Sequence, residues 1–320
     1  MAENGKDKNM TIGRFAPSPT GRMHLGNIFT ALISRLSAKR QGGKWILRIE
    51  DLDPQRSRTE YAKQLEDDLH WLGLEWDSGG LDDRNTDCSF QQSRRGGIYS
   101  EYLARLHKTG LTYPCFCTKA DIRATQAPHA SDGRIIYPGT CRPARQPYNT
   151  QPINSHLAHA FRIFVPDREI HFTDRLFGER KVNPAQECGD FVLQRADGAW
   201  AYQFAVVVDD ALMGVTEVVR GVDLLDSSAT QIYLYNLLGF NPPEFFHLPL
   251  ICNAEGKRLS KRDPELAMDV LRKKYTPERI IGMLAHLAGQ IPAPEEISFS
   301  ELLSIFDPAR IPAVPAIRLS

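Results

Sequence analysis

Two kinds of apolar spacing alternate along this chain, and together they predict an α/β fold. Short apolar runs that end at a polar residue or a turn, as buried strands do, lie at residues 12–15, 45–50 and 216–219. Apolar positions that recur every three or four residues, as in helices, lie at residues 25–36, 54–72, 98–110 and 223–238. This order of strand, loop and helix predicts a doubly wound, parallel sheet.

The run from Trp200 to Val208 is almost wholly apolar and is predicted to be a central strand. Residues 191–194 and the turn at Asp197-Gly198 would join it in a hairpin-like pair. Two further helices are expected near the end of the chain, at residues 264–274 and 277–288.

The periodic pattern breaks off between Leu111 and Pro166. Seven prolines fall in this stretch and few apolar positions repeat. This texture indicates an inserted module that is held together by something other than a large core.

Charge and composition exclude some classes of protein. The chain has 320 residues, with 39 basic and 39 acidic side chains, so only local basic clusters could bind nucleic acid. No apolar stretch approaches the roughly 18 residues of a membrane helix, and no signal peptide is recognisable, so a soluble, cytoplasmic protein is expected. Its six cysteines should then be reduced or bind a metal.

A strand-to-helix turn near the N-terminus, IGRFAPSPTGRMHLGN at residues 12–27, is the first candidate site. Backbone amides from His24 to Asn27 would lie at a helix N-terminus, where the helix dipole favours phosphate. The His24 imidazole could donate a hydrogen bond to a phosphate oxygen, and Gly26 would let a flat ring approach the backbone. A tight turn in an unrelated α/β protein is the alternative.

A second candidate is the basic segment KRLSKR at residues 257–262. Such a run is often only a solvated surface. Paired with PSPTGxxHxGN, however, its LSK core resembles the second signature of class I aminoacyl-tRNA synthetases, and RFAPSPTG is similar to their glutamyl and glutaminyl group. The resemblance implies a Rossmann-like domain that binds ATP with Mg²⁺, in which His24 and Lys261 are catalytic and the ATP-binding residues are His24, Gly26, Asn27, Ser260 and Lys261. Departures from the signatures occur at Asn27, Arg258, Leu259 and Arg262, of which the two arginines keep or add positive charge.

Charge complementarity favours glutamate as the amino acid. Its two carboxylates need guanidinium partners and its ammonium needs an acid, whereas a glutamine pocket would not leave an arginine facing an amide. The resemblance implies that Glu50 binds the α-ammonium, and it gives as glutamate-binding residues Arg14, Ala16, Ser18, Glu50, Tyr202 and Arg220. Which arginine takes which carboxylate stays open, and for Tyr202 a core aromatic is the alternative.

The proline-rich module holds the third candidate. Cys115 and Cys117 form a C-x-C pair and Cys141 follows. Three thiolates suit tetrahedral zinc, although unrelated buried thiols are an alternative. The phrase YPGTCR resembles the zinc module of one branch of the family, in which a tyrosine is the fourth ligand. The resemblance thus implies one structural Zn²⁺ on Cys115, Cys117, Tyr137 and Cys141, with His129 as the rival fourth ligand.

That branch is truncated and attaches glutamate to the queuosine base in the anticodon loop of tRNA(Asp). The similarity, which covers residues 11–290, implies a monomeric enzyme that forms glutamyl-adenylate from ATP and L-glutamate and transfers the glutamyl group to queuosine-bearing tRNA(Asp). The two halves of the catalytic domain are predicted at residues 1–110 and 186–250, with the inserted module between them at residues 111–185. The basic loop and a helical C-terminal region follow at residues 251–320. No anticodon-binding domain is expected, because fewer residues follow position 262 than the roughly 100 of a typical domain.

Three alternatives remain at this point. A short glutamyl-tRNA synthetase could charge the 3′ end of tRNA with the help of a partner, and it would require tRNA(Glu) to activate glutamate. A catalytically idle, zinc-stapled RNA-binding module would not activate glutamate at all. A small-molecule nucleotidyltransferase with the same turn would leave the zinc module unexplained.

Overall fold

The computed structural model describes residues 10–81, 89–124, 136–144, 157–253, 256–257, 259 and 264–319. A seven-stranded sheet in the order β3-β2-β1-β9-β10-β6-β7 forms its centre, and every strand pair in it is parallel except the β6–β7 hairpin. These strands are β1 (Ile12–Phe15), β2 (Lys44–Leu47), β3 (Ser78–Gly79), β6 (Ile170–Asp174), β7 (Gly178–Val182), β9 (Glu217–Gly221) and β10 (Glu244–Leu248). The predicted mostly parallel α/β sheet is therefore confirmed.

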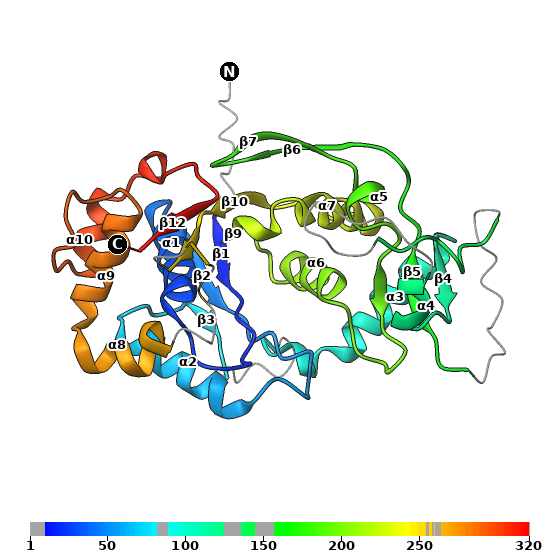
Figure 1. Ribbon diagram of the computed structural model, residues 1–320, viewed down its shortest axis with the longest axis horizontal. Coiled ribbons are helices and arrows are strands. Elements are labelled where there is room, and N and C mark those ends of the chain that lie inside the picture. Colours follow the sequence, from blue (N-terminus) through cyan, green and yellow to red (C-terminus); the bar gives the residue numbers. More distant parts are fainter. Residues whose placement is uncertain are drawn as a thin grey trace, which may run out of the picture.

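Two smaller sheets accompany the central one. A three-stranded antiparallel sheet consists of β4 (Thr112–Cys115), β5 (Ala160–Ile163) and β8 (Val192–Gln194). A parallel pair consists of β11 (Leu250–Cys252) and β12 (Ala316–Arg318). In Figure 1 the antiparallel sheet lies at one end of the molecule and the C-terminal helices lie at the other, with the central sheet between them.

Helices lie on both faces of the central sheet and around the two smaller sheets. The described helices are α1 (Leu25–Arg40), α2 (Thr59–Trp71), α3 (Gly96–Lys108), α4 (Lys119–Ala124), α5 (Pro184–Glu187), α6 (Tyr202–Leu212), α7 (Ser227–Leu238), α8 (Met268–Lys274), α9 (Pro277–Leu287) and α10 (Phe299–Ile305). Short 3₁₀ turns lie at Gln92–Arg94, Val222–Leu224, Pro264–Leu266 and Pro308–Arg310. Within the described residues, none of these helices is both long and apolar enough to cross a membrane.

The alternation of side chains along the strands separates the core into layers. Trp45 and Leu47 of β2 pack in one cluster with α1, α2 and α9, while Ile46 between them faces a second cluster with Ile232 of α7. Successive strand residues point to opposite faces, so a strand with apolar residues at every position needs helices on both sides. The expected double winding follows from this requirement.

The predicted central strand at residues 200–208 is wrong, because these residues lie in α6. All positions from Phe204 to Asp210 are buried. A helix that is buried all round has no polar stripe, and its sequence then looks like that of a buried strand. The turn at Asp197-Gly198 is present, but only a single bridge, between Gln194 and Trp200, extends the expected hairpin.

The hairpin of β6 and β7 leaves the small antiparallel sheet and adds to the edge of the central one. Asp174 pairs with Phe245 of β10. Conversely, β8 pairs with β5 in the small sheet. The four domain ranges expected from the sequence remain a prediction. The sheets show that the chain crosses between the central sheet and the small antiparallel sheet more than once.

Candidate functional site

A cavity of about 350 Å³ opens where β1 and β9 end and α1 begins. Ligands of open α/β sheets bind at such carboxyl ends. Of the residues predicted to bind ATP or glutamate, those that line this cavity are Arg14, Ala16, Ser18, His24, Gly26, Asn27, Glu50, Tyr202 and Arg220. The strand ends and the helix start thus bring together side chains up to about 200 positions apart in the sequence.

The basic segment is only partly visible, because Arg258, Ser260, Lys261 and Arg262 lie outside the described residues. Its flanks nevertheless reach the same cavity. Leu259 is buried and lines the cavity, and Ala267 forms a backbone bridge with His24. The two segments that carry the synthetase signatures therefore meet in space.

His24 caps the N-terminus of α1. Its Nδ1 accepts a hydrogen bond from the Gly26 amide at 3.2 Å, and the Asn27 side chain accepts one from the His24 amide at 3.1 Å. A neutral imidazole that accepts at Nδ1 carries its proton on Nε2, so Nε2 is a hydrogen-bond donor. A Cβ at Gly26 would come within 3.2 Å of the His24 ring, which explains why glycine suits this position.

Arg220, at the end of β9, is 5% exposed, and its described hydrogen bonds all go to neutral acceptors. Nε donates to His247 Nε2 at 2.9 Å, and Nη1 donates to Gln231 at 2.8 Å. Nη2 donates to Ser228 at 2.9 Å and to the Leu224 carbonyl at 3.2 Å. Among the residues that the structure describes, no carboxylate forms an ion pair with this guanidinium, and burial lowers the pKa of Arg220.

Glu50 and Arg14 line the same cavity and contact buried charged residues beneath it. Glu50 is 7% exposed, and its carboxylate accepts a hydrogen bond from Arg48 Nη2 at 3.1 Å. Burial raises the pKa of Glu50 to about 7, against the opposing effect of Arg48 and Arg14. Arg14 donates from Nη1 to the Val219 carbonyl at 3.1 Å, and its Nε lies 3.5 Å from Asp210 Oδ1.

Tyr202 begins α6 and lines the cavity with 37% of its surface exposed. This exposure does not fit the alternative of a core aromatic. The neighbouring aromatic Phe204 is fully buried and belongs to the core between α3, α6 and α7. The roles of Tyr202, Ala16 and Ser18 in binding glutamate remain predictions.

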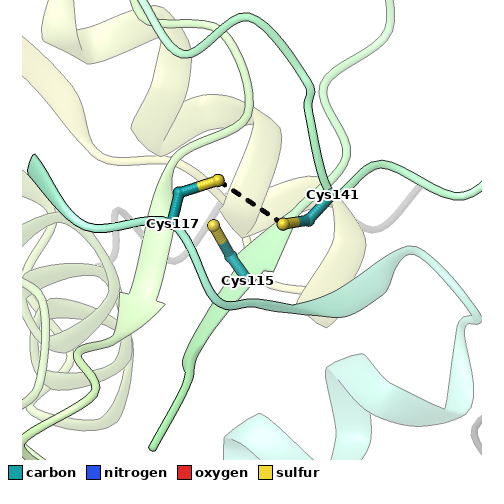
Figure 2. Close-up of side chains that lie close together, drawn as sticks. All are labelled: Cys115, Cys117 and Cys141. Atoms are coloured by element: carbon teal, nitrogen blue, oxygen red, sulfur yellow. Dashed lines mark hydrogen bonds between the residues drawn. The ribbon is translucent and has the colours of Figure 1, made fainter. Parts of the chain in front are cut away.

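The three cysteines of the inserted module converge (Figure 2). Their sulfur atoms all lie within 4.8 Å of one another, and Cys117 Sγ is 3.5 Å from Cys141 Sγ. Tyr137 closes the group, because its hydroxyl oxygen lies 3.5 Å from Cys115 Sγ and 3.9 Å from Cys117 Sγ. His129 lies outside the described residues.

The surroundings act differently on the thiols of this cluster. Burial alone would raise the pKa of the Cys115 thiol, but hydrogen bonds with Tyr137 and Arg162 hold it below its ordinary value. Burial and the neighbouring Cys141 raise the pKa of Cys117 to about 11. The Arg162 guanidinium also stacks 3.8 Å above the centre of the Tyr137 ring. Three thiols and a phenol that crowd together in a small core suit a soft divalent cation such as zinc.

Sequence reasoning missed the polar layer beneath the cavity. Its members come from five separate segments of the chain and are Arg48, Asp174, Asp210, Gln231 and His247. Each is a polar residue in or directly beside an apolar run, and such placement is the one signal that the sequence offered. Buried polar residues of this kind are rare unless they are paired.

Comparisons with known proteins agree with the synthetase signatures of the sequence. Residues 11–310 match the family described as tRNA synthetases class I (E and Q), catalytic domain. Curated relatives named Glutamyl-Q tRNA(Asp) synthetase include one from Symbiobacterium thermophilum, 47% identical over 96% of this chain and 95% of the relative. Another, from Geobacter sulfurreducens, is 42% identical over 95% of each chain.

A solved structure shows the same architecture. The glutamate-tRNA synthetase from Elizabethkingia anophelis superimposes with a TM-score of 0.83 at 31% identity. The match covers 97% of this chain and 68% of that one. The family match over most of the chain, the curated relatives and this shared fold agree with one another, and the protein therefore belongs to the class I tRNA synthetases of the E and Q group.

Proposed function

We propose that the protein activates L-glutamate with ATP and transfers the glutamyl group to the queuosine base in the anticodon loop of tRNA(Asp). The observation that carries the choice of glutamate is Arg220, a buried guanidinium in the cavity whose described partners are all neutral. A buried, uncompensated charge is costly, and a ligand carboxylate offsets that cost. The choice of tRNA(Asp) rests on the names of relatives that match nearly the whole chain.

Glu50 completes the amino-acid site. Its carboxylate lies in the same cavity as Arg14 and Arg220 and would pair with the α-ammonium of glutamate. The two arginines would then take the two carboxylates. Tyr202, Ala16 and Ser18 complete the walls of this part of the cavity.

The chemistry requires little beyond positioning. A glutamate carboxylate oxygen attacks the α-phosphorus of ATP, the bond to pyrophosphate breaks, and pyrophosphate leaves with its charge neutralised by cations. Nε2–H of His24 and the amides that begin α1 are suited to phosphate oxygens,. We assign Ser260 and Lys261 to the opposite side of the triphosphate, and Mg²⁺ to ATP itself. ATP and tRNA are cytoplasmic, and we infer the same location for the enzyme.

Two assays test this function. Glutamate-dependent exchange of pyrophosphate into ATP should proceed with no tRNA present. Labelled glutamate should then attach to tRNA(Asp) whose terminal adenosine lacks both hydroxyl groups, and not to a queuosine-free transcript of the same tRNA. Label that requires the terminal hydroxyl groups would instead indicate charging of the 3′ end and would overturn the queuosine assignment.

For the cysteine cluster we propose a structural Zn²⁺ held by Cys115, Cys117, Cys141 and the Tyr137 oxygen. Four ligands leave no open position for catalysis, and the cluster lies in the inserted module rather than in the cavity. The purified protein should contain one zinc per chain, and Cys141→Ser should lose it and lower the melting temperature. Cys252→Ser, a buried cysteine outside the cluster, is the matched control and should keep the metal.

The fourth ligand is tested separately. Tyr137→Phe removes only the oxygen, so zinc should bind more weakly in competition with a chelator. An unchanged zinc affinity in Tyr137→Phe, with loss in His129→Ala, would assign the position to His129.

A further inference from the structure

A chain of three buried side chains lies behind the cavity. His247 of β10 and Asp174 at the end of β6 are both fully buried. Asp174 Oδ2 lies 2.7 Å from His247 Nδ1, and His247 Nε2 accepts the hydrogen bond from Arg220 Nε at 2.9 Å. The chain therefore runs from the β6–β7 hairpin, through the ring of His247, to the guanidinium that lines the cavity.

Asp174 can only accept hydrogen bonds in this arrangement. The amides of Leu176 and Phe177 donate to Oδ1 at 3.0 and 2.9 Å, and the His247 amide donates to Oδ2 at 3.1 Å. Burial alone would raise the pKa of Asp174, but these bonds hold it below its usual value. An ionised carboxylate beside Nδ1 fixes the proton of the imidazole on Nδ1.

The ring of His247, in contrast to the ionised Asp174, is neutral. Burial lowers the pKa of His247 to about 4, against the opposing hydrogen bond to Asp174. With its proton on Nδ1, the neutral ring has its lone pair on Nε2. Nε2 can therefore accept the Arg220 Nε–H without neutralising the guanidinium charge.

We propose that Asp174 and His247 are positioning residues for Arg220, and that through it they set the affinity of the cavity for glutamate. Four of the five N–H groups of a guanidinium are bound here by neutral acceptors, which leaves one on Nη1 for a ligand. A carboxylate in the place of His247 would have neutralised Arg220 from within. The imidazole holds the orientation and leaves the charge for the substrate.

The β6–β7 hairpin gains a role from this chain. It is inserted between the small sheet and α5, and Asp174 reaches the central sheet only because β6 pairs with β10 at Phe245. The Phe245 ring also lies 5.2 Å from the Arg220 guanidinium. The hairpin thus supports the amino-acid site from behind, through Asp174 and His247, in addition to extending the sheet.

This inference rests on the proposed function, and pyrophosphate exchange without tRNA tests both. Asp174→Asn replaces one carboxylate oxygen by an amide NH2 that faces two N–H groups in either orientation, and His247→Leu removes the acceptor of Arg220. Loss of a buried hydrogen bond to a charged group should raise the KM for glutamate about tenfold or more in each variant. The KM for ATP should change less than about twofold, because neither side chain lines the cavity.

A conservative variant and a matched control separate positioning from folding. His247→Gln keeps an acceptor near the place of Nε2 and should recover most of the affinity for glutamate that His247→Leu loses. Arg175→Met breaks the neighbouring ion pair between Arg175 and Glu217, which anchors the same hairpin on the side away from Arg220. Its KM for glutamate should stay at the wild-type value.

The outcomes are distinct. An unchanged KM for glutamate in Asp174→Asn and His247→Leu, or an equal rise in Arg175→Met, would overturn the positioning role while the proposed function stands. If Asp174→Asn does not fold, the comparison of His247→Leu with His247→Gln decides, and equal KM values for these two variants overturn the inference. Absence of exchange in the wild-type protein would instead reject the proposed function.

Discussion

Two buried arginines, Arg48 within the polar layer and Arg220 directly above it, have different surroundings. Arg48 is fully buried and lies 2.5 Å from Asp210, 3.1 Å from Glu50 and 3.9 Å from Asp209. Arg220 is nearly as buried, yet its described partners are a histidine, an amide, a hydroxyl and a carbonyl. The first guanidinium is neutralised within the protein and supports the fold, and the second keeps its charge for a ligand.

The difference extends to the carboxylates. Burial alone would raise the pKa of Asp210, but Arg48 and Arg14 hold it below its usual value. Glu50 lies at the border between the two regions and has its pKa raised to about 7. A carboxylate that is costly to ionise in the empty cavity is well suited to a ligand ammonium. The comparison therefore separates side chains that maintain the structure from those that wait for substrate.

The largest effect on stability is expected from Arg48→Met. It leaves Asp210 and Glu50 buried without their main partner, and breaking a buried ion pair typically costs about 3–5 kcal/mol. The free energy of unfolding in urea should fall by this amount. Lys39→Met removes a surface ion pair with Asp77 and should cost less than about 1 kcal/mol. Equal losses in the two variants would contradict the structural role of Arg48.

Arg220→Met should, in contrast, lower the activity strongly and change the free energy of unfolding little. Without the guanidinium, the substrate carboxylate loses a buried partner, and kcat/KM for glutamate in pyrophosphate exchange should fall about hundredfold or more. The free energy of unfolding should hold steady or rise, because a buried charge that forms no ion pair with a described carboxylate disappears. A large loss of stability would show that Arg220 supports the fold in the manner of Arg48.

The contribution of Glu50 to the stability of the protein should depend on pH. Its folded pKa of about 7 lies above the roughly 4.3 of an unfolded glutamate, so the native state binds the extra proton between these values. Its contribution to stability should therefore fall as pH rises through this window, by up to about 4 kcal/mol, and change no further above it.

Binding should depend on pH in the opposite sense. Only ionised Glu50 attracts the substrate ammonium, so kcat/KM for glutamate should rise with a midpoint of about 7,. Glu50→Gln should lower kcat/KM and remove the midpoint. A midpoint that persists in Glu50→Gln would assign the titration to another group.

The smallest effect is expected from Ser228→Ala. It removes one neutral acceptor from Arg220 and leaves one N–H of the guanidinium unpaired, which costs about 1 kcal/mol. The KM for glutamate should rise about fivefold, with the KM for ATP unchanged. Ser304→Ala, an exposed hydroxyl bonded within α10, is the control and should leave both constants unchanged.

Local patterns were sufficient to predict much of the catalytic half. The periodicity of residues 54–72 and 98–110 corresponds to α2 and α3, and the strand predicted at residues 216–219 corresponds to β9. The prediction failed at α6, where an apolar run is enclosed by protein on every side. Periodicity reports only a contrast between buried and exposed positions, and such a run has no contrast.

The residues in and below the cavity likewise divide into those that a sequence pattern can place and those that it cannot. Arg14, Glu50 and Arg220 stand at strand ends, and a sequence pattern can place them there. Their counterparts Arg48, Asp210 and His247 could not be assigned, because a polar residue in an apolar run has no partner within its own segment. The partners come from elements that meet only in the folded chain.

By itself, the sequence determined the class of fold and the family signatures at residues 12–27, because these depend on residue types at fixed local spacing. It also singled out the three cysteines as candidate ligands, whereas Tyr137 as the fourth rests on the family resemblance. Tertiary structure alone decided that the β6–β7 hairpin joins the central sheet, and that Asp174 fixes His247 and through it Arg220. It also decided which buried arginine is neutralised and which is not. Charge compensation depends on distances of a few ångströms between segments far apart in the chain, and these distances exist only after folding.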